Sequence, residues 1–209
     1  MRRICNHPFL DGNQYKYSIT PQGSELELKD DPNNSAIIDI THLLELSNKL
    51  DITMGIIKDI LDNKPNDKII IFVHYIDSGK FLVDLCEILF AEKPQFLHGE
   101  SRNKQRIINN FKNNPLQRIL IANGNTAGVG LDLQIANHAI HFDKRWSHAV
   151  VLQATRRIYR RGQTKDVYVY RFTTLHTIEE DMQKRIDKKE YLLELITRTP
   201  MNQNIQLLE

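Results

Sequence analysis

Short runs of apolar residues, most of them Ile or Val, alternate with helix-forming stretches between residues 68 and 172 of this 209-residue chain. The predicted strands are 69–73, 95–97, 118–122, 139–142 and 166–172, and the predicted helices are 78–90, 103–111 and 148–161. Strands of this kind, separated by helices, are typical of a parallel sheet that is buried on both faces. The sequence therefore predicts an α/β fold with a mainly parallel central sheet flanked by helices.

The segments on either side of this region differ from it in composition. Residues 41–46 and 54–61 have the apolar spacing of helices, whereas residues 11–34 are polar and rich in turn-forming residues, so we predict a loop or mobile connector there. Thr177, followed three residues later by Glu180, predicts the start of a long amphipathic helix. We therefore expect an N-terminal extension (1–40), one compact α/β domain (41–176) and a C-terminal helix (177–209).

Four arginines fall within six residues in the sequence QATRRIYRRGQ, which begins at Gln153. If this segment is helical, Gln153, Arg157 and Arg160 share one face, while Ala154 and Ile158 belong to an apolar face. Guanidinium groups stay charged and fork onto phosphate oxygens, so a rigid pair of arginines suits a γ-phosphoryl group in transfer. The segment taken alone leaves a second interpretation open, which is a solvated or nucleic-acid-facing basic helix.

A glycine-rich loop, NGNTAGVGLDL from Asn123, follows the predicted strand at 118–122. Gly128 and Gly130 allow backbone amides to approach an anion closely. Open α/β sheets bind ligands at the carboxyl ends of their strands, where this loop is expected to lie. A plain turn is the alternative for the loop by itself. Its combination with a further apolar strand and the arginine-rich segment makes a ligand-binding edge the more specific interpretation.

The order of these motifs resembles the second RecA-like lobe of superfamily 2 helicases, and the SWI/SNF-type branch of DNA-translocating ATPases is the most similar. The motifs are, in order, RRICNHPFL at 2–10, HG at 98–99, the loop with Gly128 and Gly130, FD at 142–143 with Trp146, and Q-x3-R-x2-R-x-G-Q at 153–163. The resemblance implies a RecA-like three-layer sandwich with a C-terminal brace helix. It also implies that the chain is the second motor lobe of an ATP-dependent translocase, and that the N-terminal RecA-like lobe binds most of the ATP with Mg²⁺.

The resemblance assigns roles in nucleotide chemistry to particular residues. Arg160 is the predicted arginine finger, and Arg157 is predicted to hold the phosphate or to orient the interface between the lobes. Asp132 is predicted to accept a hydrogen bond from a ribose hydroxyl, with the capping of a turn as the alternative. The candidates for binding the nucleotide are Gln153, Gly128, Gly130 and Asp132.

A second set of residues is predicted to face the backbone of a nucleic acid, because hydroxyls and amides can position a strand without reading its bases. These candidates are His74, Tyr75, Ser78, His98, Gly99, Asn123, Asn125 and Thr126. A structural hydrogen bond is an equally good interpretation of His98, and packing is favoured over base stacking for Trp146. Double-stranded DNA is the expected partner, with RNA as the alternative.

Composition limits what this chain can do by itself. The formal net charge of +2 is too small to indicate nucleic-acid binding by the chain as a whole, so a basic footprint must be local. Cys5 and Cys86 cannot form a four-thiolate zinc site, and the eight histidines do not cluster as metal ligands, so we predict no metal site. No apolar run approaches the roughly 20 residues that span a bilayer, and we expect an intracellular protein with no membrane partner. The phosphate loop of ATPases is absent, so the isolated chain is predicted not to hydrolyse ATP.

Departures from the family pattern keep other function classes open. Tyr159 replaces a common histidine, Ala127 replaces a glycine of the loop, and Asp132 stands where the remodelling branch has asparagine. Because an aspartate there is familiar from RNA-helicase relatives, a strand-separating RNA or DNA helicase is an alternative to a duplex translocase. A catalytically inactive adaptor that only binds DNA or protein is another. A basic module that binds phosphates electrostatically, with steep salt dependence, is the third.

Overall fold

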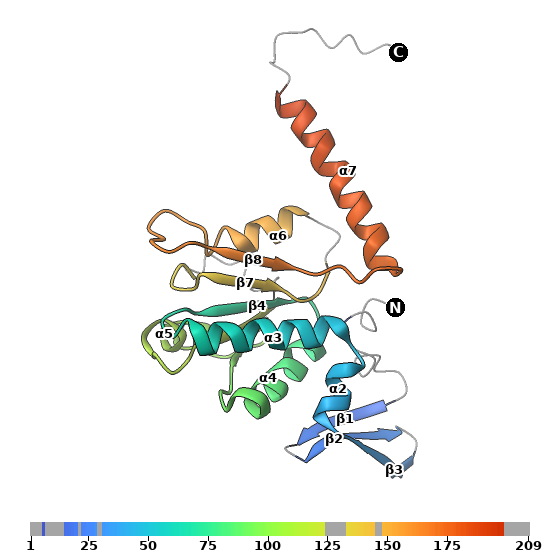
Figure 1. Cartoon of the computed structure of the whole chain (residues 1–209). Helices are drawn as coiled ribbons and strands as arrows, with labels where there is room; N and C mark the ends of the chain where they lie inside the picture. Colours follow the sequence, from blue (N-terminus) through green and yellow to red (C-terminus); the bar gives the residue numbers. More distant parts are fainter. Residues whose placement is uncertain are drawn as a thin grey trace.

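The computed structural model describes residues 6, 15–20, 22–28, 31–123, 133–144 and 148–198. Its centre is a five-stranded sheet in the order β5-β6-β4-β7-β8, and every neighbouring pair is parallel (Figure 1). The strands are β4 (Ile69–Val73), β5 (Gln95–Leu97), β6 (Ile119–Asn123), β7 (His138–His141) and β8 (Tyr168–Arg171). The predicted parallel sheet is confirmed.

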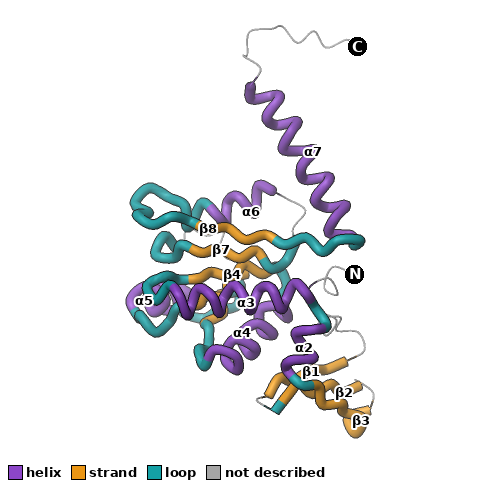
Figure 2. The backbone as a smooth tube through the Cα atoms, in the orientation of Figure 1, coloured by secondary structure: helices purple, strands orange, loops and turns teal. Residues whose placement is uncertain are grey.

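Helices cover both faces of this sheet (Figure 2). They are α3 (Asn48–Asn63), α4 (Ile76–Phe90), α5 (Lys104–Asn113) and α6 (His148–Thr155), and the short α2 (Ile40–Glu45) precedes α3. Successive side chains of a strand point to opposite faces, so β4 contributes to two cores. Ile69 and Ile71 pack with α3 and α4, whereas Ile70 and Phe72 pack with α5 and α6. The result is the expected RecA-like three-layer sandwich.

The prediction of a loop or mobile connector over residues 11–34 was wrong for the described part of that segment. β1 (Tyr15–Thr20), β2 (Gly23–Leu28) and β3 (Asp31–Ile38) form an antiparallel sheet, with β1 against α4 and β2 against α2. Gly23 adopts φ 142°, and a Cβ there would lie 2.7 Å from the carbonyl oxygen of Ile38. The proline and charged residues around the turns concealed the alternation of polar and apolar residues along β1 and β2, and β3 has no such alternation.

The predicted C-terminal helix is confirmed as α7 (Ile178–Arg198). The Thr177 hydroxyl caps its start by accepting the Glu179 N–H at 3.2 Å. Met182 and Ile186 are buried against the sheet domain, whereas Tyr191 is 62% exposed. Figure 1 shows why: the second half of α7 projects away from the other elements.

Candidate active site and nucleic-acid interface

The chain segments that leave β4, β6 and β7 meet at the carboxyl edge of the sheet. Asn123, at the end of β6, donates through Nδ2 to the carbonyl oxygen of His74 at 2.8 Å. Asp143 follows β7, and its carboxylate accepts the N–H of Tyr75 at 2.9 Å and the N–H of His74. The rings of His74 and Tyr75 have centroids 4.7 Å apart. The structure therefore gathers His74, Tyr75 and Asn123 into one cluster, and their contact with a nucleic acid stays a prediction.

Asp143 organises this cluster, although the sequence had suggested no role for it. Its side chain is buried, and its carboxylate also accepts the Ser78 hydroxyl at 3.2 Å and the amide of Asn6. Burial raises the pKa of the Asp143 carboxyl, whereas the N–H donors of Tyr75 and His74 favour its ionised form. Tyr75 is the N-cap of α4 and makes no side-chain capping bond, so Asp143 supplies the acceptor that the start of this helix needs. The available signal was the position of an aspartate directly after a buried strand.

The other described candidates for contact with a nucleic acid are Ser78, His98 and Gly99, and they lie outside the cluster of His74, Tyr75 and Asn123. Ser78 is fully buried and supports the loop through Asp143, so its hydroxyl does not face the surface. His98 and Gly99 follow β5, which β6 separates from β4. The His98 N–H donates to the Ser101 hydroxyl at 2.9 Å, and its ring packs on Phe96 with centroids 4.8 Å apart. Gly99 is exposed.

The glycine-rich loop connects two distant parts of the domain. The candidates Asn125, Thr126, Gly128, Gly130 and Asp132 lie outside the described residues, as does Trp146. Described residues flank the loop on both sides. Asn123 ends β6 at the carboxyl edge, whereas the N–H of Leu133 donates to the carbonyl oxygen of Arg157 at 3.4 Å. The described residues on its two sides, Asn123 and Leu133, therefore lie beside the nucleic-acid candidates and beside the arginine segment.

The arginine segment is not one continuous helix, as had been predicted for 148–161. Helix α6 ends at Thr155, and the chain then tightens: the Ile158 N–H donates to the Thr155 carbonyl at 3.0 Å. Gln153, Arg157 and Arg160 therefore do not follow one regular helical face. The predicted apolar face is confirmed, because Ala154 and Ile158 are buried in the core beside α5. Arg160 and Gln153 are exposed, and Arg157 is half-buried.

The turn that carries these arginines, residues 156–163, lies near the amino ends of the strands. Gln163 anchors it: its Nε2 donates to the carbonyl oxygens of Gln134 at 2.8 Å and Ala136 at 2.9 Å, just before β7. The arginine turn therefore does not share the carboxyl edge with Asn123, because α6 runs back across the sheet before the chain enters β8. An open groove lies beside the turn and is lined by Lys112, Asn113, Gln134, Ile135, Gly162, Gln163, Thr164 and Lys165.

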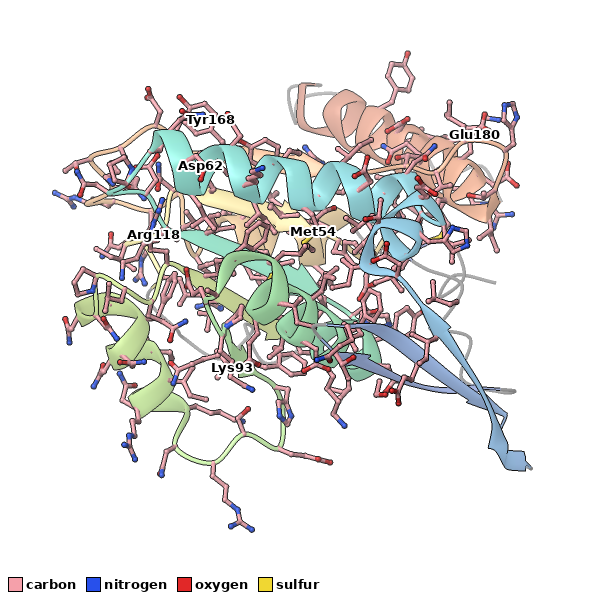
Figure 3. The ribbon with its side chains drawn as sticks, turned by 60° about the horizontal axis from the view of Figure 1, so that its bottom comes forward. Met54, Asp62, Lys93, Arg118, Tyr168 and Glu180 are labelled. Atoms are coloured by element: carbon pink, nitrogen blue, oxygen red, sulfur yellow. The ribbon has the colours of Figure 1, made fainter. Side chains whose placement is uncertain are left out.

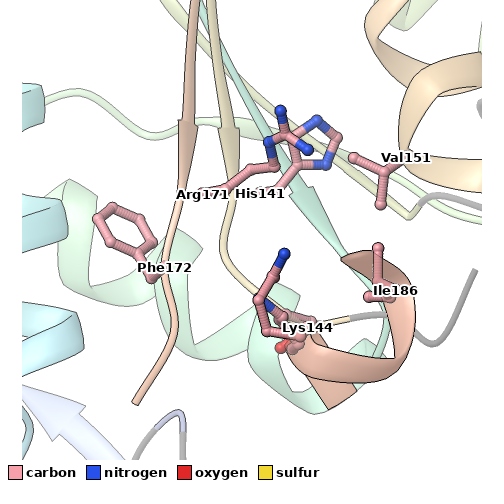
Figure 4. Close-up of a pocket in the computed structure, with 8 residues that line it drawn as sticks. His141, Lys144, Val151, Arg171, Phe172 and Ile186 are labelled. Atoms are coloured by element: carbon pink, nitrogen blue, oxygen red, sulfur yellow. The ribbon is translucent and has the colours of Figure 1, made fainter. Parts of the chain in front are cut away.

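A small cavity lies between β7, β8, α6 and the first turns of α7 (Figure 4). Lys144 and Arg171 reach toward it from two sides, with His141 behind them. The Lys144 ammonium donates to the Thr173 hydroxyl at 2.6 Å and to the Gln183 amide oxygen. Burial lowers the pKa of Lys144 against the opposing effect of Glu179. These contacts join α7 to the sheet next to Asp143.

In the described ranges, no three His, Cys, Asp or Glu side chains gather in a way that could hold a metal ion. Within the same ranges, every helix is too short or too polar to cross a membrane. The chemistry that remains is hydrogen bonding by loop backbone groups at the carboxyl edge and anion binding by exposed guanidinium groups at the arginine turn.

Comparison with known proteins gives a consistent picture. Residues 50–162 match the family described as the helicase conserved C-terminal domain. The chain is 35% identical over 136 residues to YwqA of Bacillus subtilis, which covers 64% of this chain and 15% of that protein. It is 27% identical over 217 residues to the human DNA repair and recombination protein RAD54B, covering 99% of this chain and 24% of that protein.

Solved structures agree with the sequence comparisons. The SWI2/SNF2 ATPase core of Sulfolobus solfataricus is 34% identical, with a TM-score of 0.61 over 75% of this chain and 32% of that one. The same core in complex with double-stranded DNA gives a TM-score of 0.59 over 73% of this chain and 32% of that one. This chain thus spans about a seventh of YwqA and a third of the archaeal ATPase core.

Proposed function

Because this chain belongs to the helicase conserved C-terminal domain family and has the C-terminal lobe fold of SWI2/SNF2 ATPases, we propose that it moves double-stranded DNA when joined to an ATP-binding lobe. The archaeal relative bound to double-stranded DNA supports DNA as the partner. The proposal assigns the ATP site to the cleft between the two lobes. It assigns Mg²⁺ to the other lobe, since no metal-binding group is formed by the described residues.

One observation carries the nucleotide part of the proposal, which is the exposed position of Arg160 on an anchored turn. Gln163 fixes the turn to the strand-entry segment before β7, and Ile158 fixes it to the core. A backbone anchored in this way fixes the point from which the guanidinium reaches a phosphate, and an arginine finger needs this positioning. We assign Arg160 as the finger and Arg157 as its partner, with Gln153 bonding across the closed interface.

The nucleic-acid part rests on the carboxyl edge. His74 and Tyr75 present their rings there, and the buried Asn123 holds the carbonyl oxygen of His74. This arrangement suits contact of the rings with a sugar–phosphate backbone rather than with bases. The glycine-rich loop, including Asn125, Thr126 and Asp132, leads from this edge to the arginine turn. Closure of the lobes on ATP brings the arginines to the γ-phosphate, and reopening after hydrolysis shifts the DNA-gripping surface.

The test uses the full-length protein and the isolated chain side by side. ATP hydrolysis is measured with duplex DNA, single-stranded DNA and RNA. We expect no turnover by the isolated chain, and turnover by the full-length protein that duplex DNA stimulates most strongly. Stimulation by RNA alone would replace the translocase by an RNA helicase.

Binding measurements separate the remaining function classes. Affinity for duplex DNA is measured at two salt concentrations, with and without an ATP analogue. A motor lobe predicts affinity that depends on nucleotide, whereas a simple basic module predicts steep salt dependence and no effect of nucleotide. Nucleotide-dependent binding without any hydrolysis by the full-length protein would identify an inactive adaptor.

A further inference from the structure

Five parts of the chain that are distant in sequence meet in one buried polar network behind the carboxyl edge. Its members are Asn6, Ser47, Lys49, Ser78, Asp143 and Glu179. All six side chains are buried, and the side chains of Lys49 and Glu179 are 3% and 1% exposed. Charged groups without water must find partners within the protein, so the geometry of such a network is fixed by its hydrogen bonds.

Asn6 is the link between the two charged halves of this network. Its Nδ2 donates to Asp143 Oδ1, and its Oδ1 accepts from Lys49 Nζ at 3.1 Å. Its backbone oxygen accepts the Ser47 hydroxyl at 2.7 Å. The amide of Asn6 thus presents a donor to a carboxylate and an acceptor to an ammonium at the same time. An aspartate at this position would oppose Asp143, and an apolar residue would remove one donor from Asp143 and one acceptor from Lys49.

The far half of the network belongs to helix α7. Lys49 Nζ lies 2.5 Å from Glu179 Oε1, and Glu179 Oε2 accepts the Thr174 N–H at 2.9 Å. Glu179 stands in the first turn of α7, and Lys49 stands in the first turn of α3. The position of the start of α7 is thus transmitted through Lys49 and Asn6 to Asp143.

The half of the network around Asp143 fixes the loop between β4 and α4. Asp143 accepts the N–H groups of His74 and Tyr75, which fixes the backbone that carries both rings. Among the described residues, four donors reach the Asp143 carboxylate, and Asn6 is the one that comes from outside the α/β domain.

We propose that Asn6 is a positioning residue that couples helix α7 to the nucleic-acid edge through Lys49 and Asp143. A displacement of α7 weakens the Lys49–Glu179 pair, turns the Asn6 amide, and loosens the hold of Asp143 on His74 and Tyr75. The coupling rests on the proposed function, because it concerns the edge assigned to DNA. It assigns to Asn6 a positioning role that the proposed catalytic residues do not fill.

The test uses the full-length protein with Asn6→Leu, which keeps the side-chain size and removes both the donor and the acceptor. Two quantities are measured: the duplex DNA concentration that gives half-maximal ATPase stimulation, and the hydrogen-exchange rates of the His74 and Tyr75 amides. We expect the half-stimulating concentration to rise roughly tenfold, the effect of losing one hydrogen bond to a charged group. Maximal turnover should fall by much less than this rise, and both amides should exchange faster.

Asn63→Leu is the matched control, because Asn63 also donates an amide to an aspartate, Asp59, but does so on the exposed surface. It should change neither quantity. Glu179→Gln tests the same coupling from the α7 side, because its amide oxygen can still accept the Thr174 N–H while the carboxylate charge that pairs with Lys49 is removed. It should raise the half-stimulating concentration in the same direction but by less.

The outcomes separate this coupling from the proposed function. If duplex DNA fails to stimulate the unaltered protein, the proposed function is wrong. If DNA stimulates the unaltered protein and Asn6→Leu and Glu179→Gln leave the half-stimulating concentration and both amide exchange rates unchanged, the coupling is overturned. Faster exchange with unchanged DNA dependence would also overturn it, because the network would then be only structural.

Discussion

Charged side chains stabilise the backbone at both ends of the central sheet, but their charge is negative at one end and positive at the other. At the carboxyl end, the carboxylate of Asp143 accepts backbone N–H groups at the start of α4. At the amino end, cations donate to backbone carbonyls: Arg118 to Ile60, Leu61 and Lys64 at the end of α3, and Lys68 to Phe111, Asn114 and Gln117 at the end of α5. Figure 3 shows Arg118 and Tyr168 at one end of the domain and Glu180 at the other.

The direction of the chain explains this difference. At its carboxyl end β4 leads into the start of α4, where N–H groups lack partners, whereas at their amino ends β4 and β6 follow the ends of α3 and α5, where carbonyls lack partners. An acid suits the first end and bases suit the second. Backbone N–H groups that could bind an anion are therefore found at the carboxyl end of the sheet. At the amino end, an anion must be bound by charged side chains such as those of the arginine turn.

The largest expected effect is a loss of ATP hydrolysis, with little loss of stability, when an arginine of the turn is replaced. Arg160→Ala in the full-length protein should lower DNA-stimulated ATP hydrolysis about 10³-fold or more, because an arginine finger stabilises the charge of the transition state. The free energy of unfolding should change by no more than about 0.5 kcal/mol, since the side chain is exposed. Arg161→Ala, at an exposed neighbour, is the control. Wild-type turnover by Arg160→Ala would remove the finger assignment.

The amino end should show the reverse pattern, with loss of stability as the primary effect. Arg118→Met leaves the carbonyl oxygens at the end of α3 without the donor that now lies 2.6 Å from Lys64 and 2.9 Å from Leu61. We expect a loss of about 2–4 kcal/mol in the free energy of unfolding, measured by urea denaturation. Arg106→Met, at an exposed position of α5, should cost less than about 0.5 kcal/mol. Equal losses in both variants would contradict the capping role.

A pair of glycine substitutions compares packing at the carboxyl end with packing in the middle of a helix. A Cβ on Gly79 would lie 2.2 Å from the ring of Phe96, so Gly79→Ala should destabilise the protein by about 1–3 kcal/mol through overpacking. A Cβ on Gly55 in α3 would meet nothing within 4 Å, so Gly55→Ala should stabilise it by about 0.5–1 kcal/mol. Thermal denaturation of both variants provides the measurement, and shifts of the same sign would refute the close approach of α4 to β5.

The smallest expected effect concerns pH at the amino end. Burial acts to raise the pKa of Asp67, but hydrogen bonds from Lys165, Asn137 and His138 outweigh it and hold the pKa well below the usual range. A carboxyl whose folded-state pKa is lowered contributes stability above its usual pKa of about 4, and this contribution is lost as the pH falls through the folded-state value. Asp67→Asn should therefore cost about 1 kcal/mol at pH 7.

The same substitution should cost progressively less below about pH 4, because the unfolded chain then binds a proton at Asp67, whereas the folded protein does so only as the pH falls through its lowered pKa. Urea denaturation at pH 7 and at pH 3 gives the comparison. A cost of Asp67→Asn that grows as the pH falls would contradict the sign of the shift.

Much of the fold could be predicted from the sequence because its signals are local. The apolar run at β4 and the spacing of Leu50, Met54 and Ile57 along α3 follow from the geometry of strands and helices. The Thr177 cap marked the start of α7 in the same way. The sheet β1–β3 was missed because turn-forming and charged residues outweighed the alternation along β1 and β2, and the early end of α6 was missed because its apolar face continues to Ile158.

The candidate site also has features that local sequence signals predict and features that depend on tertiary packing. The sequence by itself determined which residue types could meet a phosphate, since the motif order identified Arg157, Arg160 and the glycine-rich loop. Only the tertiary structure decided that the arginine turn and the cluster at His74 lie at different ends of the sheet, and that Asn6 reaches Asp143 across 137 positions of sequence. Spacing along a chain encodes the faces of helices and strands, but contacts between distant segments depend on how those elements pack, so their partners emerge only in three dimensions.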